Sequence, residues 1–231
     1  DILVTKLTKQ KKMYGLFIRG KVLEHMSKIL DDFIIIDDVI STTYQDELEN
    51  YLHQHQQWWF QSDITFSDDH LKALKESGQE VEHRPGWGSM VYDPQKSYGS
   101  INHMVTPILY NAVSLINVKL DEIGLIRCFM SAPASRYSTN LVDKPHVDKP
   151  IPHYVCLYYV NDSDGDTIIF KKIADGVSEH KLQKDIDPND LEVLTTVSPK
   201  KGRCVIFNGL NYHSSTQPTK NIRTIVNFNF T

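Results

Sequence analysis

The chain has 231 residues, of which 40% are hydrophobic and 23% are charged, and its formal net charge is −4. This balance is typical of a globular protein with a buried core, and it excludes a disordered or low-complexity polypeptide. No apolar run approaches the roughly 18 residues that a membrane span needs, and the first residues lack the pattern of a secretory leader. We therefore expect one soluble, cytoplasmic domain over residues 1–231; the sequence leaves the oligomeric state open.

Charge is distributed unevenly along the chain. Residues 1–30 hold seven Lys or Arg against two acidic residues, a net charge of +5, so the remainder carries −9. A protein that binds nucleic acid usually presents a basic stripe across its working face. Because most of the chain is acidic, we expect no nucleic-acid partner, and we expect the basic first 30 residues to be solvated.

The three cysteines, Cys128, Cys156 and Cys204, lie far apart in apolar, strand-like runs. An odd number of widely separated cysteines forms neither a disulfide framework nor a cysteine-rich metal site. Free cysteine is among the most buried residue types. We therefore predict buried free thiols, which is consistent with a reducing compartment.

The first half of the chain predicts one strand and three helices. Residues 30–40 contain four consecutive apolar residues between acidic pairs, a pattern typical of a buried strand. Ser41 follows as a suitable helix N-cap. The three predicted helices cover residues 44–56, 69–76 and 107–123. The third has the longest apolar stripe, and Gly124 is expected to end it.

After residue 124 the sequence consists of short β-rich runs with turn signals between them. These runs are residues 125–131, 153–160, 167–171, 191–197, 203–207 and 222–230. Successive short strands without intervening helices indicate a double-sheet jelly roll rather than an alternating α/β sheet. We predict a mainly β fold with flanking helices (α+β), in which residues 1–124 pack outside a double-stranded β-helix core of residues 125–231.

His146 and Asp148 form an H-x-D triplet that is a candidate metal-binding motif. Ten His and 20 Asp in this chain are expected to give about one such triplet by chance, so the motif alone has no weight. Residues two apart in an extended segment point to the same side, and Pro145 and Pro150 favour an extended segment here. His213 can supply a second imidazole. Two histidines and a carboxylate are the ligand set of non-haem Fe(II) oxygenases; a hydrogen-bonded core histidine is the alternative for each.

Arg223 is a candidate anion-binding residue at the start of the last predicted strand. Alternation places Arg223 on one strand face with Ile225 and Asn227. If the opposite face packs in the core, the guanidinium points inward, where an unpaired charge is very costly. A bound carboxylate removes that cost, because the planar fork accepts it through two parallel hydrogen bonds. The alternative is a solvent-facing arginine at a strand end.

With these residues in place, the second half resembles the iron(II)- and 2-oxoglutarate-dependent dioxygenases, and among them the prolyl 4-hydroxylase-like branch. The family pattern combines a tyrosine before H-x-D, a glycine-containing turn, a P-x-x-G strand entry, a distal histidine and a later basic residue. In this chain the pattern is carried by Tyr137, His146, Asp148, Tyr159, Gly165, Thr167, Pro199, Gly202, His213 and Arg223. The match covers about residues 125–231 in the correct order, and residues 1–124 match only loosely.

The resemblance implies a double-stranded β-helix in which His146, Asp148 and His213 hold Fe(II). It also implies the reaction: O2 is used to hydroxylate a C–H bond while 2-oxoglutarate is converted to succinate and CO2. No catalytic residue beyond the metal ligands is implied. The presence of Asp148 argues against halogenation, because halogenases of the family lack this carboxylate.

The resemblance further implies a site for 2-oxoglutarate. Arg223 would bind the distal carboxylate with the help of Tyr159, and Tyr137 would reach the other end. Two positions depart from the family pattern: a second glycine of the turn is replaced by Asp166, and Ile225 stands where many members have serine. These departures concern the placement of cosubstrate and substrate rather than the metal ligands.

The substrate itself is left open between a peptidyl proline and a small molecule such as a free amino acid. Trp59, Arg84 and Trp87 lie in aromatic segments outside the predicted roll, where this family closes over substrate, and are the candidate substrate residues. Packing of these aromatics against the roll is the alternative. A catalytically silent metal-binding jelly roll is the main alternative function. A zinc hydrolase is a weaker one, because no general base is obvious.

Overall fold

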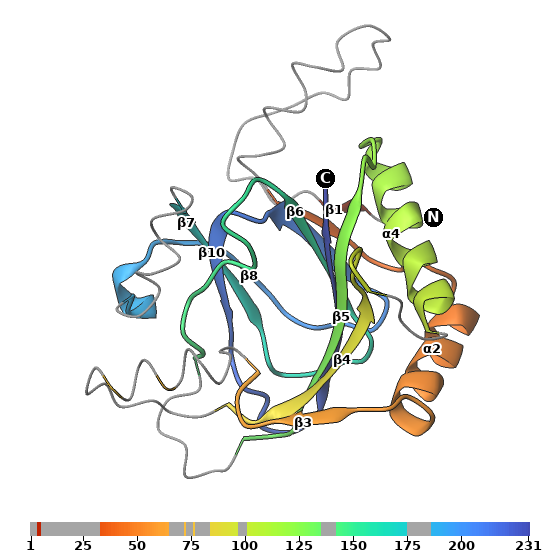
Figure 1. Ribbon diagram of the computed structural model, residues 1–231, viewed down its shortest axis with the longest axis horizontal. Helices are drawn as coiled ribbons and strands as arrows, with labels where there is room; N and C mark the ends of the chain where they lie inside the picture. Colours follow the sequence, from red (N-terminus) through yellow and green to blue (C-terminus); the bar gives the residue numbers. More distant parts are fainter. Residues whose placement is uncertain are drawn as a thin grey trace, which may run out of the picture.

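The structure, a computed structural model, contains two facing β-sheets with two helices on the outer side of the larger sheet (Figure 1). It describes residues 4–5, 33–64, 72, 76, 84–96, 101–134, 142–174 and 186–231. The predicted mainly β fold with a jelly-roll core and external helices is therefore confirmed. The basic first 30 residues lie almost wholly outside the described part of the chain.

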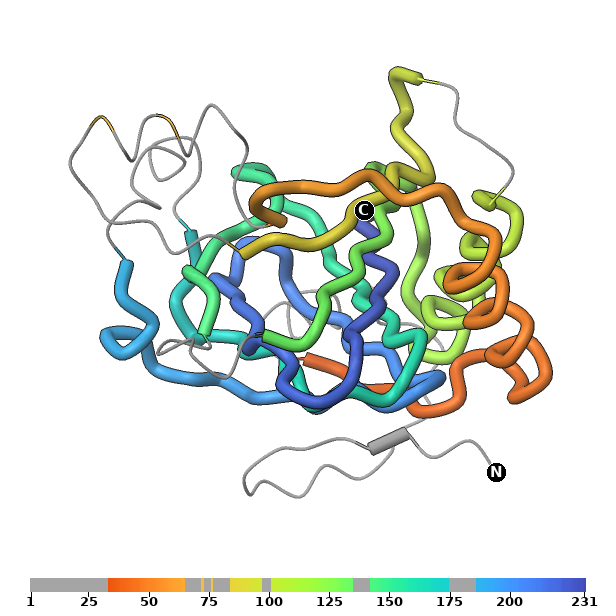
Figure 2. Tube along the Cα trace, turned by 90° about the horizontal axis from the view of Figure 1, so that it is seen from below, coloured from red at the N-terminus to blue at the C-terminus, as the bar shows by residue number. Residues whose placement is uncertain are grey.

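The large sheet has eight antiparallel strands in the order β1-β2-β9-β6-β11-β5-β4-β3. Along the chain these are β1 Val4–Thr5, β2 Ile34–Ile36, β3 Trp59–Gln61, β4 Gly86–Tyr92, β5 Ile123–Ser131, β6 Tyr154–Tyr159, β9 Cys204–Asn208 and β11 Arg223–Phe230. Figure 2 shows β11, in blue, running beside β5, in green. The last strand of the chain is thus central in the sheet, and its side chains are buried along its whole length.

The small sheet has three antiparallel strands in the order β10-β7-β8. Their bounds are β7 Thr167–Ile173, β8 Val193–Val197 and β10 Asn211–Ser215, and a short 3-10 helix, η3, covers Pro188–Asp190. An isolated bridge pairs His146 with His213 of β10. The segment before β6 therefore lies beside the small sheet, whereas β6 itself belongs to the large one.

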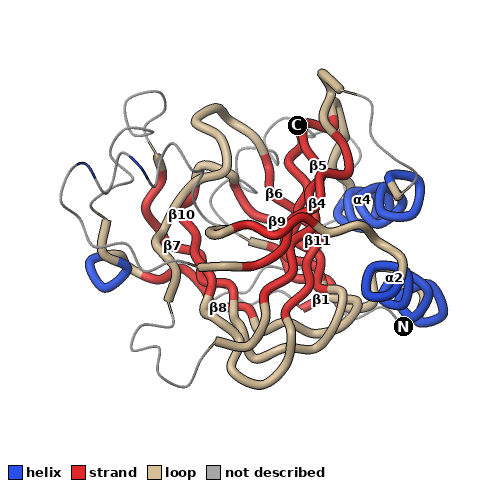
Figure 3. The backbone as a smooth tube through the Cα atoms, turned by 60° about the horizontal axis from the view of Figure 1, so that its bottom comes forward, coloured by secondary structure: helices blue, strands red, loops and turns tan. Residues whose placement is uncertain are grey.

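Two helices, α2 Thr42–Gln54 and α4 Asn102–Ile116, cover the outer face of the large sheet, on the side away from β7, β8 and β10 (Figure 3). Ser41 is the N-cap of α2, as predicted, and its side chain accepts a hydrogen bond from the Tyr44 amide. Of the predicted helix over 69–76, only residues 72 and 76 are described, both helical. No helix in the described part of the chain is long and apolar enough to cross a membrane.

The predicted bounds of the long helix, 107–123, were wrong at both ends. Pro107 is not its first residue but lies inside α4, where the ring costs one backbone hydrogen bond. The helix ends where Asn117 adopts a left-handed conformation, with φ 56°. Asparagine tolerates this conformation and can replace glycine as a helix stop. Gly124, the expected stop, is instead part of β5.

Alternation along β11 separates two apolar cores. Val226 and Phe228 face the helices in the outer core. Ile225 faces the interior of the roll, where it packs with residues from both sheets, among them Ile169 and Val197 of the small sheet. Arg223 shares the strand parity of Ile225 and is buried, so the inward orientation expected for it is confirmed.

Four strands were not predicted: β1, β3, β4 and β10. β3 is a three-residue edge strand, and its partner β4 contains Gly86 and Gly88, a residue type that strands usually avoid. β10 contains Asn211, His213 and two serines, yet it is nearly all buried. Polar strands of this kind lack the apolar periodicity from which strands are predicted.

The cysteines are as predicted. Cys128, Cys156 and Cys204 are all free and buried. They lie in the outer core between the large sheet and the helices, away from the interior of the roll. Burial raises the pKa of the Cys128 thiol to about 12, so this side chain acts as a small apolar group.

A matched pair of leucines in α4 tests this packing. Leu109 is completely buried, whereas Leu115 of the same helix is 39% exposed. We expect Leu109→Ala to lower the free energy of unfolding by about 2–5 kcal/mol, because it leaves a cavity in the outer core. Leu115→Ala should cost less than about 1 kcal/mol. Urea unfolding of both variants measures the difference, and equal losses would contradict the described packing of α4.

Candidate metal centre

Backbone pairing brings the two histidines together, although they lie far apart in the sequence. The His146 amide donates to the His213 carbonyl at 2.9 Å, and the His213 amide donates to the His146 carbonyl at 2.9 Å. The Asp143 amide donates to the Ser215 carbonyl at 2.8 Å, which extends the pairing toward the bridge between residues 142 and 216. The extended segment predicted around the H-x-D triplet therefore docks along β10.

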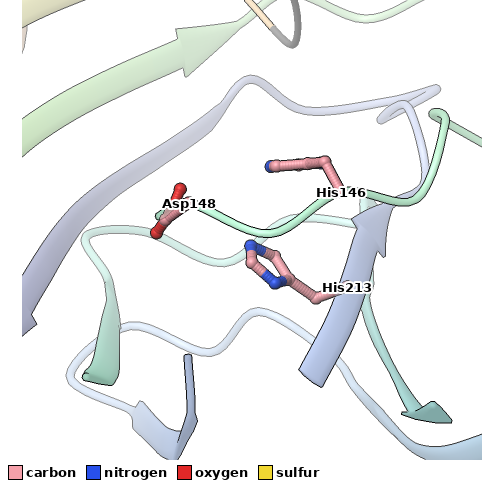
Figure 4. A group of neighbouring side chains, drawn as sticks. All are labelled: His146, Asp148 and His213. Carbon is pink, nitrogen blue, oxygen red and sulfur yellow. The ribbon is translucent and has the colours of Figure 1, made fainter. Parts of the chain in front are cut away.

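The side chains of His146, Asp148 and His213 converge on one point (Figure 4). One ligand atom from each lies within 4.8 Å of the others, and the two imidazole centroids are 4.6 Å apart. Nδ1 of His146 lies 3.3 Å from the Lys144 carbonyl, and Nδ1 of His213 lies 3.1 Å from the Asn211 carbonyl. Since a carbonyl only accepts, each Nδ1 carries the hydrogen, and each Nε2 keeps its lone pair for a metal.

Both carboxylate oxygens of Asp148 accept hydrogen bonds. Arg127 Nη2 donates to Oδ1 at 2.8 Å, while the side-chain amides of Asn227 and Asn229 donate to Oδ2 at 3.0 and 2.8 Å. Burial alone would raise the pKa of Asp148, but the charge of Arg127, the two histidines and the Asn229 amide hold that pKa well below its usual value. The carboxylate is therefore ionised and fixed in orientation.

His213 is the most enclosed of the three candidate ligands. It is buried, and its ring meets the edge of Phe207 at a centroid distance of 5.2 Å. Burial, with the adjacent His146, lowers the pKa of His213 to about 4. A neutral imidazole at ordinary pH is the form that binds a metal.

Arg223, at the start of β11, is a buried cation. Its Nε donates to the Gly165 carbonyl and its Nη2 donates to Thr167 Oγ1, both at 2.8 Å. A Cβ at Gly165 would lie 2.9 Å from the Arg223 side chain, so glycine leaves the room that this arginine occupies. Within the described ranges no carboxylate lies within 4.0 Å of the guanidinium. Burial lowers the pKa of Arg223, yet a guanidinium remains charged.

Tyr159 lies next to Arg223, with the guanidinium carbon 5.9 Å from the ring centroid. Its hydroxyl donates to Thr167 Oγ1 at 2.8 Å, the same oxygen that accepts from Arg223. Burial raises the pKa of Tyr159 to about 12, so the hydroxyl keeps its proton. The structure therefore brings Arg223 and Tyr159 together as expected, whereas Tyr137 lies outside the described residues.

The three candidate substrate residues are not brought together. Arg84 is buried, and its Nε donates to Asp143 Oδ1 at 2.8 Å. By strand register, Trp59 shares the sheet face of Gly88 and Phe129, the inner face, and is 59% exposed at the sheet edge. Trp87 lies on the opposite face, where its ring meets Phe60 edge-on at 6.2 Å.

Asp143 is a buried carboxylate that ties the ligand segment to its surroundings. Besides Arg84, it accepts from Ser215 Oγ at 2.6 Å and from Gln217 Nε2 at 2.7 Å. Burial raises the pKa of Asp143, against the opposing effects of these partners. The role of Arg84 in this structure is therefore an ion pair that fixes the segment before His146.

Sequence reasoning missed the residues that hold Asp148. The sequence did contain a sign of them. Arg127 is a charged residue in an otherwise apolar strand, and Asn229 is a second polar residue on the same strand face as Asn227. Polar side chains at alternate positions of a buried strand need partners. Asp143 gave no comparable signal, because it lies in an irregular polar segment.

The buried pair between Arg84 and Asp143 can be tested directly. Arg84→Met leaves a buried carboxylate without its cation, so we expect the free energy of unfolding to fall by about 3–5 kcal/mol in urea denaturation. The double variant Arg84→Met/Asp143→Leu should recover part of that loss, because it removes the stranded charge as well. A loss below about 1 kcal/mol for the single variant would mean that the pair is only a surface-type contact.

Known proteins resemble this chain in structure but not in sequence. No protein-family model matches the sequence, and comparison with curated proteins finds no match. HygX from Streptomyces hygroscopicus, solved with nickel, 2-oxoglutarate and hygromycin B, superposes with a TM-score of 0.56 at 10% identity. That match covers 92% of this chain and 87% of HygX.

Two further solved structures have the same architecture. SnoN, a non-haem α-ketoglutarate-dependent epimerase from nogalamycin biosynthesis, matches with a TM-score of 0.55 at 12% identity, over 90% of this chain and 82% of SnoN. A prolyl hydroxylase from Trichoplax adhaerens, solved with a fragment of hypoxia-inducible factor, matches with a TM-score of 0.53 at 14% identity, over 90% of this chain and 89% of that enzyme. At these identities the likeness establishes the fold: this chain has the jelly roll of the iron- and 2-oxoglutarate-dependent enzymes.

Proposed function

We propose that this protein is an Fe(II)- and 2-oxoglutarate-dependent dioxygenase that hydroxylates a C–H bond of a peptide or small-molecule substrate. The observation that carries the proposal is a pair of features in one roll. One feature is the His-Asp-His donor set. The other is Arg223, a buried arginine without a carboxylate partner in the described residues. The two features fit together, because the cosubstrate implied by such an iron site is a dianion. One of its carboxylates can bind at the iron, and the other can pair with the buried arginine.

The donor set fits iron(II). Two neutral imidazole nitrogens and one carboxylate oxygen can occupy one side of a metal and leave the other positions open, the arrangement typical of non-haem Fe(II) oxygenases. His146 and His213 present Nε2, since each Nδ1 is used in a backbone hydrogen bond. Asp148 is held by three side chains, so its carboxylate is already oriented before a metal binds.

The surroundings of Arg223 fit the distal carboxylate of 2-oxoglutarate. A planar guanidinium binds a carboxylate through parallel hydrogen bonds, and burial strengthens them. Thr167 and the Tyr159 hydroxyl lie beside it and can adjust their hydrogen bonds to the same carboxylate. Tyr137 is proposed to reach the other end of the cosubstrate.

Iron(II), 2-oxoglutarate and O2 would together supply the oxidising chemistry, with succinate and CO2 as the products of the cosubstrate. The protein's own residues then have three tasks. His146, Asp148 and His213 hold the metal, Arg223 and Tyr159 orient the cosubstrate, and the inner apolar core around Ile225 excludes water. No side chain is required to act as an acid or base.

The main alternative is a metal-binding jelly roll without activity. Such a module would account for the three ligands, but it gives no reason for a buried Arg223 without a carboxylate partner in the described residues. Substrate size stays open, because the related folds include an enzyme solved with a peptide and one solved with hygromycin B. Of the candidate substrate residues, Trp59 remains our proposal for substrate contact, because it is exposed on the inner sheet face.

The metal site can be tested by removing one ligand at a time. We expect His146→Ala, Asp148→Ala and His213→Ala each to abolish the visible charge-transfer absorption that appears when Fe(II) and 2-oxoglutarate are added without oxygen. Succinate formation should disappear with it. His103→Ala, which changes an exposed histidine of α4, is the matched control and should behave like the unchanged protein.

The unchanged protein decides between an enzyme and a silent module. Slow conversion of 2-oxoglutarate to succinate, even without a substrate, is expected from an enzyme. Absorption without any succinate would favour the silent module, and full turnover in any ligand variant would refute the assigned metal site.

The cosubstrate site is tested by Arg223→Met and Arg223→Lys. Losing a buried, charge-assisted pair of hydrogen bonds should raise the apparent dissociation constant of 2-oxoglutarate by about tenfold to a hundredfold. The lysine variant keeps the charge but not the fork, so its loss should be smaller. Anaerobic titration with 2-oxoglutarate at saturating Fe(II) measures both. An unchanged constant would show that the distal carboxylate binds elsewhere.

A further inference from the structure

We infer that the substrate carries an anionic oxygen group, such as a carboxylate, which binds to Arg127 beside the metal centre. The inference rests on the proposed function and adds the chemical class of the substrate. It assigns to Arg127 two tasks: Nη2 holds Asp148, and Nη1 is left for the substrate.

The hydrogen bonds of Arg127 leave most of its guanidinium unused. Nη2 donates to Asp148 Oδ1 at 2.8 Å and lies 3.2 Å from Asn229 Oδ1. Nε is buried and has no hydrogen-bond partner, and no described residue accepts from Nη1. The side chain is 23% exposed, so the group is neither sealed in the core nor free in solvent. Three of its five N–H donors are therefore left for another acceptor.

The charge of Arg127 is in excess at the assembled centre. The two positive charges of iron(II) and the one of Arg223 are balanced by the one negative charge of Asp148 and the two of 2-oxoglutarate. These charges would sum to zero before Arg127 is included. A half-buried guanidinium added to a neutral centre favours an anion as the next group to bind.

A second cation lies near the same strand. Lys149 directly follows Asp148, and its Nζ lies 2.7 Å from the position that a Cβ at Gly124 would occupy, three residues before Arg127 on β5. Burial lowers the pKa of His153, and the charges of Lys149 and Arg127 act in the same direction, against the Ile151 hydrogen bond and Asp148. Lys149 therefore adds positive charge to the surroundings of Arg127.

Holding Asp148 uses only one nitrogen of the Arg127 guanidinium. Arg127 serves as the counter-ion of that carboxylate, and Asn227 and Asn229 donate to its other oxygen, but none of these contacts uses Nη1 of Arg127. The competing explanation is that Arg127 binds the second carboxylate of 2-oxoglutarate. The experiment must therefore separate the substrate anion from the cosubstrate.

Proton relaxation next to a paramagnetic metal provides that separation. The protein is loaded with Mn(II) and saturating 2-oxoglutarate, which gives no turnover, and the methyl-proton relaxation of acetate is compared with that of acetamide. The two probes have nearly the same shape and differ in charge. We expect acetate to relax about tenfold faster than acetamide, the factor of one charge-assisted contact.

Variants assign the effect to Arg127. Arg127→Met should reduce acetate relaxation to the level of acetamide, and Arg127→Lys should retain part of it. Lys149→Met removes the neighbouring cation without touching Asp148 and should lower the effect by a smaller factor. Lys119→Met is the control of equal charge change, because Lys119 is exposed and, among the described residues, pairs with Asp121. Each measurement is made at a Mn(II) concentration that saturates that variant.

Equal relaxation of acetate and acetamide by the unchanged protein overturns the inference, and this comparison needs no variant. Relaxation that survives in Arg127→Met also overturns it, because acetate then binds the metal itself. Arg127→Met can also lower the affinity for 2-oxoglutarate. If that loss is as large as the loss of acetate relaxation, Arg127 binds the cosubstrate rather than the substrate. If Mn(II) or 2-oxoglutarate fails to bind the unchanged protein, the proposed function fails, and this inference fails with it.

Discussion

The pairing of one short extended segment with β10 is the constraint on which the rest of the site depends. His146 and His213 exchange two backbone hydrogen bonds, and the pairing continues through Asp143 and Ser215. His146 lies outside the named strands, in the segment before β6, and this pairing places it beside β10 of the small sheet. Because backbone pairing fixes direction as well as distance, both imidazoles point to the same side, and Asp148, two residues further on, follows the alternation of the extended chain.

Around this pairing, the charges of the interior are compensated in pairs with one exception. Asp148 is matched by Arg127, and Asp143 is matched by Arg84. Arg223 has neutral oxygen acceptors only, within the described residues. Since a buried charge without a counter-ion is costly, the exception is where an external anion gains most by binding. Arg223 is thus the buried cation without a carboxylate partner in the described residues, whereas Arg127 pairs with Asp148 through one nitrogen only.

Periodicity and ordered spacing in the sequence were sufficient to predict the features that depend on alternation. The jelly roll, the inward orientation of Arg223 and the outer packing of Val226 could all be inferred, because alternation assigns each residue of a buried strand to a face. The end of α4 at Asn117 and the polar strand β10 could not, since both depend on tertiary contacts that overrule local preference. Arg84 was predicted at the substrate because it lies in an aromatic segment outside the predicted roll. Its ion pair with Asp143, 59 positions away, could not be predicted, because no local pattern links the two residues.

The inner sheet face beside Asp148 carries a group of polar side chains. Related folds at 10–14% identity include enzymes with different reactions and substrates of very different size, so the shared roll cannot determine the substrate. The roll interior is apolar around Ile225, and Arg127, Asn227 and Asn229 form a polar group around Asp148. The polar group around Asp148 includes the charge of Arg127, which favours an anionic substrate over a neutral one of the same shape. Recognition by this protein is therefore expected to begin with the anionic group of its substrate, at the same arginine that fixes its metal ligand.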